Sequence, residues 1–231
     1  TVYDKKTRGQ IFAVPVAPSS GYSTYVQNLG TVGNKGIELT LTARPVETKD
    51  FTWSLTYIFS RDWNKVLNLT GSSQDPLLFG FSSAVDAEMR AVVGKTVASI
   101  YTGIPQTNAA GQIVVNPYTG FPLPNTTPLY GLNLTKGYMG SGLYTYQMGL
   151  TNTFTYKHWA LSGSLDFRYG GVMYSETANL TLFVGNAAPT VYNGRRPFIV
   201  PNSVVDAGNG KYNANTVYIG SNGAGEVDQY Y

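Results

Sequence analysis

Large apolar and small polar residues alternate along the stretch from Leu143 to Tyr169. Because successive side chains of a strand point to opposite faces, this period of two predicts two strands, over 143–156 and 159–169. Lys157-His158 between them is expected to form a tight turn. Each strand has the ~9–11 residues that cross a bilayer at a tilt, with aromatic residues at both ends of the apolar row. The stretch therefore predicts a transmembrane β-hairpin.

The same alternation predicts three more strands nearer the N-terminus, over about 1–12, 35–45 and 51–63. Pro45 is expected to end the second of them, because proline cannot donate a hydrogen bond to a neighbouring strand. A short polar turn, Glu47–Asp50, then leads into the third. The predicted fold class is all-β, an antiparallel sheet forming part of a large transmembrane β-barrel.

Long segments rich in Gly, Pro and Asn lie between these strands, over about 13–33, 64–142 and 170–231. We predict that they are loops, with one short helix over Ser83–Val93. Loops beyond ~12–15 residues are uncommon in compact soluble domains. Outer-membrane barrels combine short periplasmic turns with long extracellular loops. The tight turns are therefore expected to face the periplasm and the long segments the outside.

Charged residues inside the predicted strands fall mainly on the polar phase of the alternation. A charge on the lipid face near the middle of a bilayer costs ~2–4 kcal/mol, whereas a barrel lumen is wet. Arg61 is on the apolar phase, but beside Trp63 at a strand end, where a long side chain can reach the interface. The residues expected to face the lumen are Glu38, Arg44, Asp166 and Arg168. A soluble sandwich with one wet face would show the same alternation.

Composition narrows the alternatives. Only 13% of the residues are charged while 13% are aromatic, and the net charge of +3 is small and spread along the chain. Charge alone therefore indicates neither a nucleic-acid partner nor an anionic membrane partner. The chain has no cysteine, which excludes disulfides, thiol catalysis and zinc–thiolate sites. No apolar run approaches the ~20 residues of a membrane helix, which excludes helical spans but not barrels.

The sequence predicts no enzyme. His158 is the single histidine, and no nucleotide-binding, hydrolase or metalloprotease motif is present. No cofactor is expected. The Asp, Asn and Gly residues of 207–231 could hold a structural calcium ion in an extracellular loop, although they lack EF-hand spacing.

Aromatic and arginine side chains in the long segments are the candidate ligand-binding groups. They supply stacking faces and forked donors that suit sugars or peptides. Packing of the loops against one another would use the same residues. The candidates are Tyr101, Tyr118, Tyr130, Tyr174, Tyr192, Arg195 and Arg196.

Several stretches resemble the SusC/RagA-type TonB-dependent outer-membrane transporters of Bacteroidetes. NLGTVGNKGIEL at Asn28–Leu39 is similar to the family's entry into a late barrel strand. Similar segments follow in the family's order. They are Lys49–Val66, Val93–Tyr101, Leu150–Ser162 with Arg168–Gly171, and Arg195–Asn202. Thr96 and Ala98 depart from the Pro and Gly that are commoner in the third of these.

This resemblance implies that the chain is a C-terminal portion of a much larger barrel. The family imports oligosaccharides or peptides across the outer membrane with energy from TonB, through regions absent here. A SusD-like surface lipoprotein is its expected partner, and outer-membrane lipid its surroundings. Two alternatives remain, a soluble secreted glycan-binding module and a passive porin.

Overall fold

The computed structural model describes residues 1–15, 21–22, 24–28, 30–69, 77–78, 87–129 and 134–219. It divides into two compact units. The strand unit comprises Thr1–Ser82, Glu88–Tyr101 and Tyr138–Met173, and the loop unit comprises Ser83–Ala87, Thr102–Gly137 and Tyr174–Tyr231. In the described residues, no helix is long and apolar enough to span a membrane.

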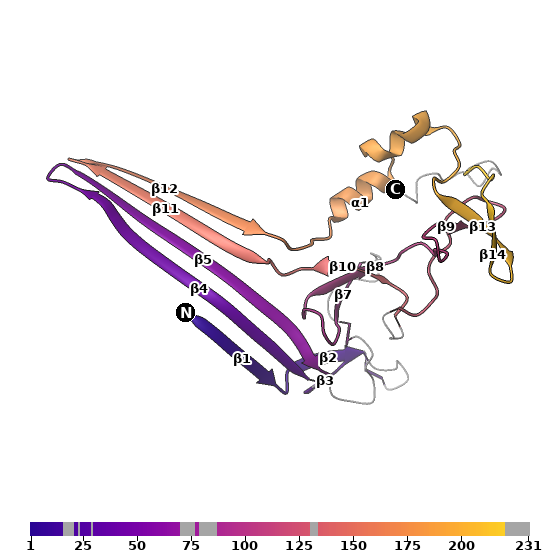
Figure 1. Cartoon of the computed structure of the whole chain (residues 1–231), viewed down its shortest axis with the longest axis horizontal. Coiled ribbons are helices and arrows are strands. Elements are labelled where there is room, and N and C mark those ends of the chain that lie inside the picture. Colours follow the sequence, from indigo (N-terminus) through magenta and orange to yellow (C-terminus); the bar gives the residue numbers. More distant parts are fainter. Residues whose placement is uncertain are drawn as a thin grey trace. The chain divides into compact units, whose positions relative to one another are not determined.

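A five-stranded sheet dominates the strand unit, in the order β1-β4-β5-β11-β12 (Figure 1). Every neighbouring pair in it is antiparallel, so the predicted antiparallel all-β fold is confirmed. The sheet is open, because β1 and β12 are its two edges. Its strands are β1 (Val2–Arg8), β4 (Thr31–Glu47), β5 (Phe51–Asn68), β11 (Tyr146–Tyr156) and β12 (Trp159–Tyr169).

Pro45 does not end its strand as predicted. β4 continues to Glu47, and its pairing with β5 shifts between Ala43, opposite Leu55, and Val46, opposite Trp53. This irregularity places one extra residue in β4, so proline is tolerated where the regular ladder is interrupted. The shift also returns Val46 to the apolar face, although its position in the simple alternation is polar.

The segments predicted as loops contain short strands. A hairpin of β2 (Ile11–Pro15) and β3 (Thr24–Asn28) overlaps the first, and β1 ends at Arg8 rather than residue 12. The second holds β9 and the sheet β10-β8-β7-β6. The bounds in that sheet are Leu77–Leu78 for β6, Glu88–Ala91 for β7, Ser99–Thr102 for β8 and Gly137–Ser141 for β10.

The predicted helix over Ser83–Val93 is wrong where the structure describes it. Glu88–Ala91 is β7, and Glu88, Met89 and Arg90 lie opposite Tyr101, Ile100 and Ser99 of β8. Residues 83–86 lie outside the described residues. Helix propensity is a weak preference, and pairing with the following strand, β8, overrides it here.

A small core and an amide bridge join this sheet to β5. Val66, Leu69 and Ala91 are buried together, with Val97 packed against them. The Asn64 side-chain amide donates to Asn34 Oδ1 at 2.6 Å. Asn64 Oδ1 in turn accepts the Val97 N–H at 2.7 Å. The segment after β7 is therefore fixed to the end of β5.

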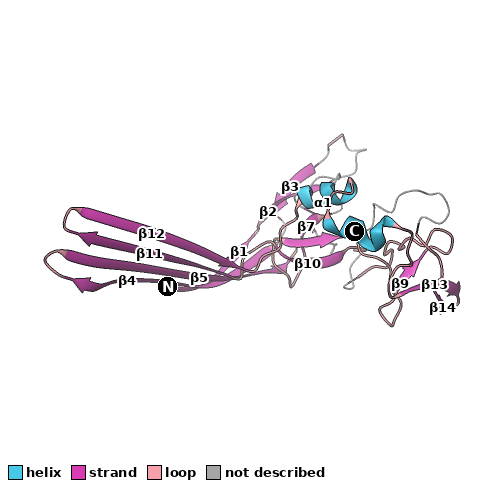
Figure 2. Cartoon of the chain, turned by 90° about the horizontal axis from the view of Figure 1, so that it is seen from above, coloured by secondary structure: helices cyan, strands magenta, loops and turns pink. Residues whose placement is uncertain are grey.

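The loop unit has its own small sheet (Figure 2), and its own core of buried side chains. The sheet order is β14-β13-β9, and Val115, Val200 and Ile219 are buried together. Helix α1 begins after Ser175, whose hydroxyl caps it by accepting the Ala178 N–H. The bounds are Ile113–Val115 for β9, Glu176–Phe183 for α1, Ala188–Arg195 for the 3₁₀ segment η2, Ser203–Gly208 for β13 and Lys211–Ala214 for β14.

Candidate functional site

The two faces of the five-stranded sheet differ in chemistry, and the register shows which residues share each face. Leu39, Phe59, Met148 and Phe167 are successive neighbours across four strands, as are Leu41, Tyr57, Leu150 and Leu165. We call this side the apolar face. Its outer edge is strongly exposed in this chain, with Trp159 80% and Leu165 66% accessible. Apolar side chains left this open require a covering environment.

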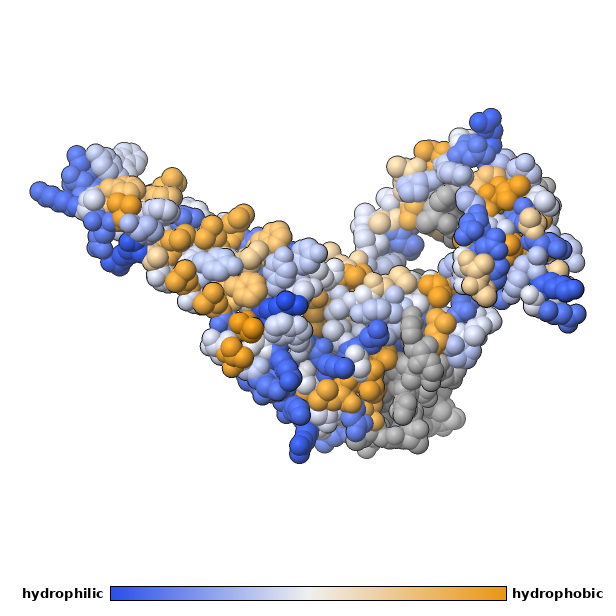
Figure 3. All heavy atoms as spheres, viewed as in Figure 1, coloured by the Kyte–Doolittle hydropathy of each residue, from blue (hydrophilic) through white to orange (hydrophobic). Residues whose placement is uncertain are grey.

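Aromatic rings lie at both ends of the apolar face. Near the turns, Trp53 stacks on Phe154 with centroids 5.8 Å apart. At the opposite end, Tyr146 stacks on Tyr169 at 5.0 Å, and the Arg61 guanidinium lies 4.5 Å from the Trp63 ring centre. Figure 3 shows hydrophobic residues along the strands and hydrophilic residues at the turn end. Tyrosine and tryptophan favour membrane interfaces because their rings are apolar and their N–H or O–H groups are polar.

The length of the apolar face matches a bilayer. β12 has 11 residues from Trp159 to Tyr169. Ten steps correspond to about 34 Å along the strand, or about 25 Å along the membrane normal at a tilt of about 40°. The apolar band of a transmembrane barrel is also about 25 Å tall.

The opposite side, which we call the polar face, carries hydroxyls and charges. Thr151 and Ser164 share a hydrogen bond of 3.0 Å, as do Thr153 and Ser162. Ile58 also lies on this face, opposite Thr40 and Gly149. The face is therefore a largely polar wall, in which Ile58 is an apolar side chain among hydroxyls and charges.

The predicted lumen residues divide into two places on this wall. Glu38 and Arg168 lie on one cross-strand row, through Ser60 and Gln147. Asp166 is two residues away on β12 and forms an ion pair of 3.0 Å with Arg168. Arg44 lies apart from them, at the irregularity near the turn, and pairs with Glu47 at 3.6 Å.

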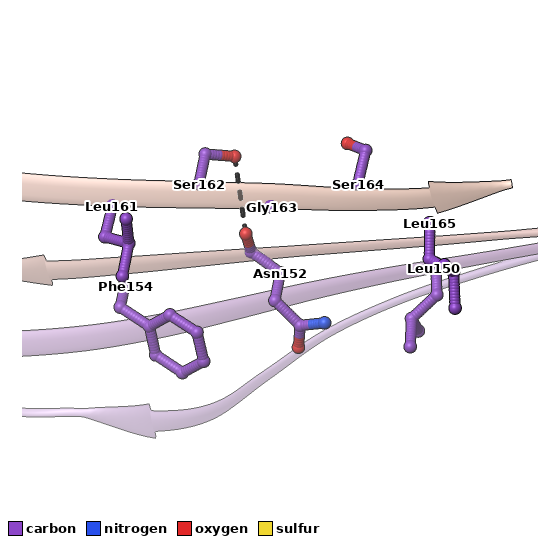
Figure 4. A pocket seen from close by; sticks show the side chains of 8 residues that line it. All are labelled: Leu150, Asn152, Phe154, Leu161, Ser162, Gly163, Ser164 and Leu165. Carbon is purple, nitrogen blue, oxygen red and sulfur yellow. Dashed lines mark hydrogen bonds between the residues drawn. The ribbon is translucent and has the colours of Figure 1, made fainter.

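One shallow groove of about 540 Å³ interrupts the apolar face around Asn152 and Gly163 (Figure 4). Leu150, Phe154 and Leu161 line it. The Asn152 side-chain oxygen accepts the indole N–H of Trp53 at 3.1 Å, so this polar group is satisfied. The groove contains no charged side chain and therefore offers no acid–base chemistry.

A second groove, of about 390 Å³, lies between the end of β5 and the segments around Lys95 and Tyr138–Thr145. We call it the basic groove, because Arg61, Lys65 and Lys95 line it together with Trp63, Tyr138 and Tyr144. Sequence reasoning missed this site. The available signal was that Lys65 shares its strand phase with Arg61 and Trp63. Thr96, where proline is commoner in the resembling family, also lines the groove and donates to Ser141 Oγ at 2.9 Å.

The predicted ligand-binding residues are not gathered at one point. Tyr101 is 1% exposed and packs against Tyr138, with ring centres 5.5 Å apart, so its ring faces are not free for a ligand. Tyr118 is 75% exposed on a turn of the loop unit, and Tyr174 is half-buried. Tyr130 lies outside the described residues.

Tyr192, Arg195 and Arg196 do lie close together, at the end of η2. Tyr192 packs edge-on against Phe198, with ring centres 4.8 Å apart. Arg195 donates to the Gly185 carbonyl at 2.6 Å, and Arg196 donates to the Asn193 carbonyl at 3.3 Å. These side chains therefore hold the local fold as well as reaching the surface.

Two other expectations concern metals. In the part of the chain that the structure describes, no three His, Cys, Asp or Glu side chains are grouped to hold an ion. The predicted calcium segment is described only up to residue 219. There, Gly208, Asn209 and Gly210 have positive φ angles of 83°, 53° and 73° at the turn between β13 and β14. This backbone requirement accounts for the residue types at these three positions.

Comparison with known proteins gives relatives at the level of sequence and of fold. No family model matches the chain. Over 201 residues, 80% of this chain, it is 27% identical to the TonB-dependent receptor SusC of Bacteroides thetaiotaomicron and covers 19% of that protein. Over 67 residues, 29% of this chain, it is 40% identical to the TonB-dependent receptor P3 of Formosa agariphila and covers 7% of it.

The predicted resemblance to SusC/RagA-type TonB-dependent transporters is confirmed. In fold, the chain matches the structure of the RagAB peptide transporter with a TM-score of 0.59 and 16% identity, over 82% of this chain and 21% of that one. The chain therefore spans about a fifth of SusC and of the RagAB chain. These relatives are named as receptors and transporters, which supports the prediction that the chain is not an enzyme.

Proposed function

We propose that this chain forms part of the wall of a TonB-dependent transporter barrel in the bacterial outer membrane. The main evidence is the five-stranded antiparallel sheet, which has one polar face and one apolar face. Aromatic residues lie at both ends of the apolar face. Such a sheet can face lipid on its apolar side and water on its polar side. A soluble glycan-binding module would have to cover side chains such as Trp159 and Leu165.

The polar face lines the lumen in this proposal. Glu38, Asp166 and Arg168 would face the transport path or the domain that plugs it, and Arg44 would lie near the periplasmic turns. Charges are tolerated there because the lumen contains water. The sheet edges at β1 and β12 would pair with further strands, since open edges are not stable in hydrocarbon.

The whole protein would import oligosaccharides or peptides, with energy from TonB and a SusD-like lipoprotein over its outer loops. Similarity to SusC, and in fold to a peptide transporter, supports this assignment. In the loop unit, Tyr192, Arg195 and Arg196 are the best candidates for contact with the substrate or the lipoprotein, followed by Tyr118 and Tyr174. Tyr101 is a core residue instead.

A matched pair of substitutions on β12 tests the orientation of the sheet. Leu165→Arg places a charge in the apolar face, and Ser164→Arg places the same charge on the adjacent position of the polar face. We expect Leu165→Arg to lower the stability of the inserted protein by about 2–4 kcal/mol and Ser164→Arg to cost little. The measurement is urea unfolding of the whole protein in lipid vesicles, together with its yield in the outer-membrane fraction.

Equal effects of the two substitutions would refute the assignment of faces. Recovery of the wild-type protein as a soluble species, without detergent, would refute the membrane location and favour a secreted binding module. A passive porin would be indicated if uptake continued unchanged in cells that lack TonB.

A further inference from the structure

Basic side chains lie on the apolar face at the end opposite the tight turns, just beyond the band of aromatic residues there. Lys6 and Lys65 flank Gly33 on one cross-strand row, and Lys35 lies beside Trp63 on the next. All of these side chains share the face of Leu39, because the register is regular from Val32 to Ala43. The Lys35 ammonium forms an ion pair of 3.0 Å with Asp4. Among the described strands, Asp4 is the acidic residue on this part of the face.

The basic groove adjoins this row. Two of its three cations are held against aromatic rings, Arg61 at 4.5 Å from the Trp63 centre and Lys95 at 4.6 Å from the Tyr138 centre. Within the described residues, Arg61, Lys65 and Lys95 form no ion pair with a carboxylate. Asp62 also lines the groove, but its carboxylate accepts the Tyr3 hydroxyl at 3.0 Å. With three cations against one carboxylate, the groove carries a net positive charge.

We propose that the basic groove binds the phosphate-bearing headgroup of a membrane lipid. Three cations around a space of about 390 Å³ complement a doubly charged phosphate better than a single carboxylate. Arginine also offers paired donors that match the oxygens of phosphate. This inference rests on the proposed membrane location of the sheet.

Two of the three groove cations, Arg61 and Lys65, lie on the lipid side of the sheet, which favours a lipid over a transported solute. Arg61, Trp63 and Lys65 alternate with Asp62 and Asn64 along β5, and so project on the side of the apolar face. Acyl chains lying along Leu39 and Phe59 would bring a headgroup to the level of Trp63, Tyr146 and Tyr169. A solute in the lumen would meet the polar face instead. The basic groove and the apolar face thus form one continuous surface for a single lipid molecule.

The test uses the whole transporter that carries this chain, purified in uncharged detergent and mixed with micelles containing diphosphoryl lipid A. Native mass spectrometry counts the bound lipid. The Arg61→Gln, Lys65→Gln, Lys95→Gln variant removes the three groove charges. Each basic residue near a charged lipid surface contributes about a fivefold gain in affinity, so removing three should weaken binding by about a hundredfold. Higher salt should weaken binding to the wild type as well.

Two control variants separate the groove from general effects of charge and folding. Lys5→Gln, Lys49→Gln, Lys211→Gln removes three cations that do not line the groove, and should bind like the wild type. The charge-conserving Arg61→Lys, Lys65→Arg, Lys95→Arg variant should retain most of the binding. The dephosphorylated lipid should bind the wild type and the groove variant equally.

Unchanged lipid binding in the groove variant would overturn the inference. Competition by inorganic phosphate alone, at concentrations where the lipid binds, would overturn it in favour of a free-anion site. Outer-membrane fractionation of the same proteins separates the two proposals. A wild-type protein absent from the membrane contradicts the proposed function, whereas normal insertion and uptake without a lipid effect contradict only the headgroup site.

Discussion

Gly36, inside the NLGTVGNKGIEL stretch, illustrates how one residue is determined by a partner far away in the sequence. It lies directly opposite Tyr3 in the pairing of β1 with β4. A Cβ on Gly36 would collide with the Tyr3 ring. That ring crosses the glycine and reaches Asp62 Oδ1 with its hydroxyl at 3.0 Å. Glycine in a strand is a weak point, and an aromatic ring across it covers the exposed backbone.

Gly36→Ala should therefore destabilise the protein by about 1 kcal/mol, because the displaced ring loses its hydrogen bond to Asp62. Gly163→Ala is the matched control, since a Cβ there meets nothing within 4 Å. That change should be neutral or stabilise by about 0.5–1 kcal/mol. Urea midpoints measure both. In the Gly36→Ala background, Tyr3→Phe should lower the stability little further. If the losses of the two single variants added in full, the lost Tyr3–Asp62 hydrogen bond would not be their shared cause.

Among the elements, β5 has a second role that its alternation does not predict. Its last residues bond both to β4 of the main sheet and to the segment that joins β7 and β8. Asn64 bonds both Asn34 of β4 and the backbone of Val97, and Val66 exchanges backbone hydrogen bonds with the turn at Gly94-Lys95. This connection positions Lys95 beside Lys65 in the basic groove. Two asparagines of the resembling motifs thus fix the lining of that groove.

Asn64→Ala should loosen the segment from residue 92 to 101 without unfolding the main sheet. The Val97 N–H loses its acceptor in a half-buried place, which costs about 1–3 kcal/mol. Hydrogen exchange should become faster in this segment by a corresponding factor, while β11 and β12 keep their protection. Asn68→Ala, at an exposed position of the same strand, is the control. Faster exchange across all of β5 and β11 would show instead that the bridge supports the sheet itself.

At the scale of the whole molecule, the proposed barrel separates residues that affect insertion from residues that affect transport. Arg168 and Asp166 are half-exposed on the polar face, at 49% and 62% of their side-chain areas. An exposed pair contributes only about 0–1 kcal/mol, so Arg168→Glu should leave the yield of inserted protein unchanged. It should alter uptake of a charged substrate, because the reversed charge faces the water-filled path. Initial uptake rates in whole cells measure this effect.

The exchanged pair Asp166→Arg, Arg168→Asp is the control, because it restores the local charge balance. Its uptake should lie closer to that of the wild type than the uptake of Arg168→Glu does. If single reversals at both positions left uptake and plug retention unchanged, these residues would not face the lumen.

Local alternation is a strong signal, and for that reason the main strands were predictable from the sequence. The period of two in Trp159–Tyr169 depends on nothing beyond the strand itself, so residues on each face can be read directly. The irregularity at Pro45 was not predictable, because it depends on how β4 pairs with Leu55 and Trp53 of β5. The strand at Glu88–Ala91 was missed for a similar reason, since its partner is Ile100 of β8.

By itself, the sequence determined the fold class, the two chemical faces and the relationship to TonB-dependent transporters. These follow from local periodicity and from motifs, which need no knowledge of distant contacts. Only the tertiary structure placed Lys65 and Lys95 in one groove and put Tyr101 in the core. The small net charge of the chain did not indicate this cluster of basic residues, because local charge density depends on which strands become neighbours.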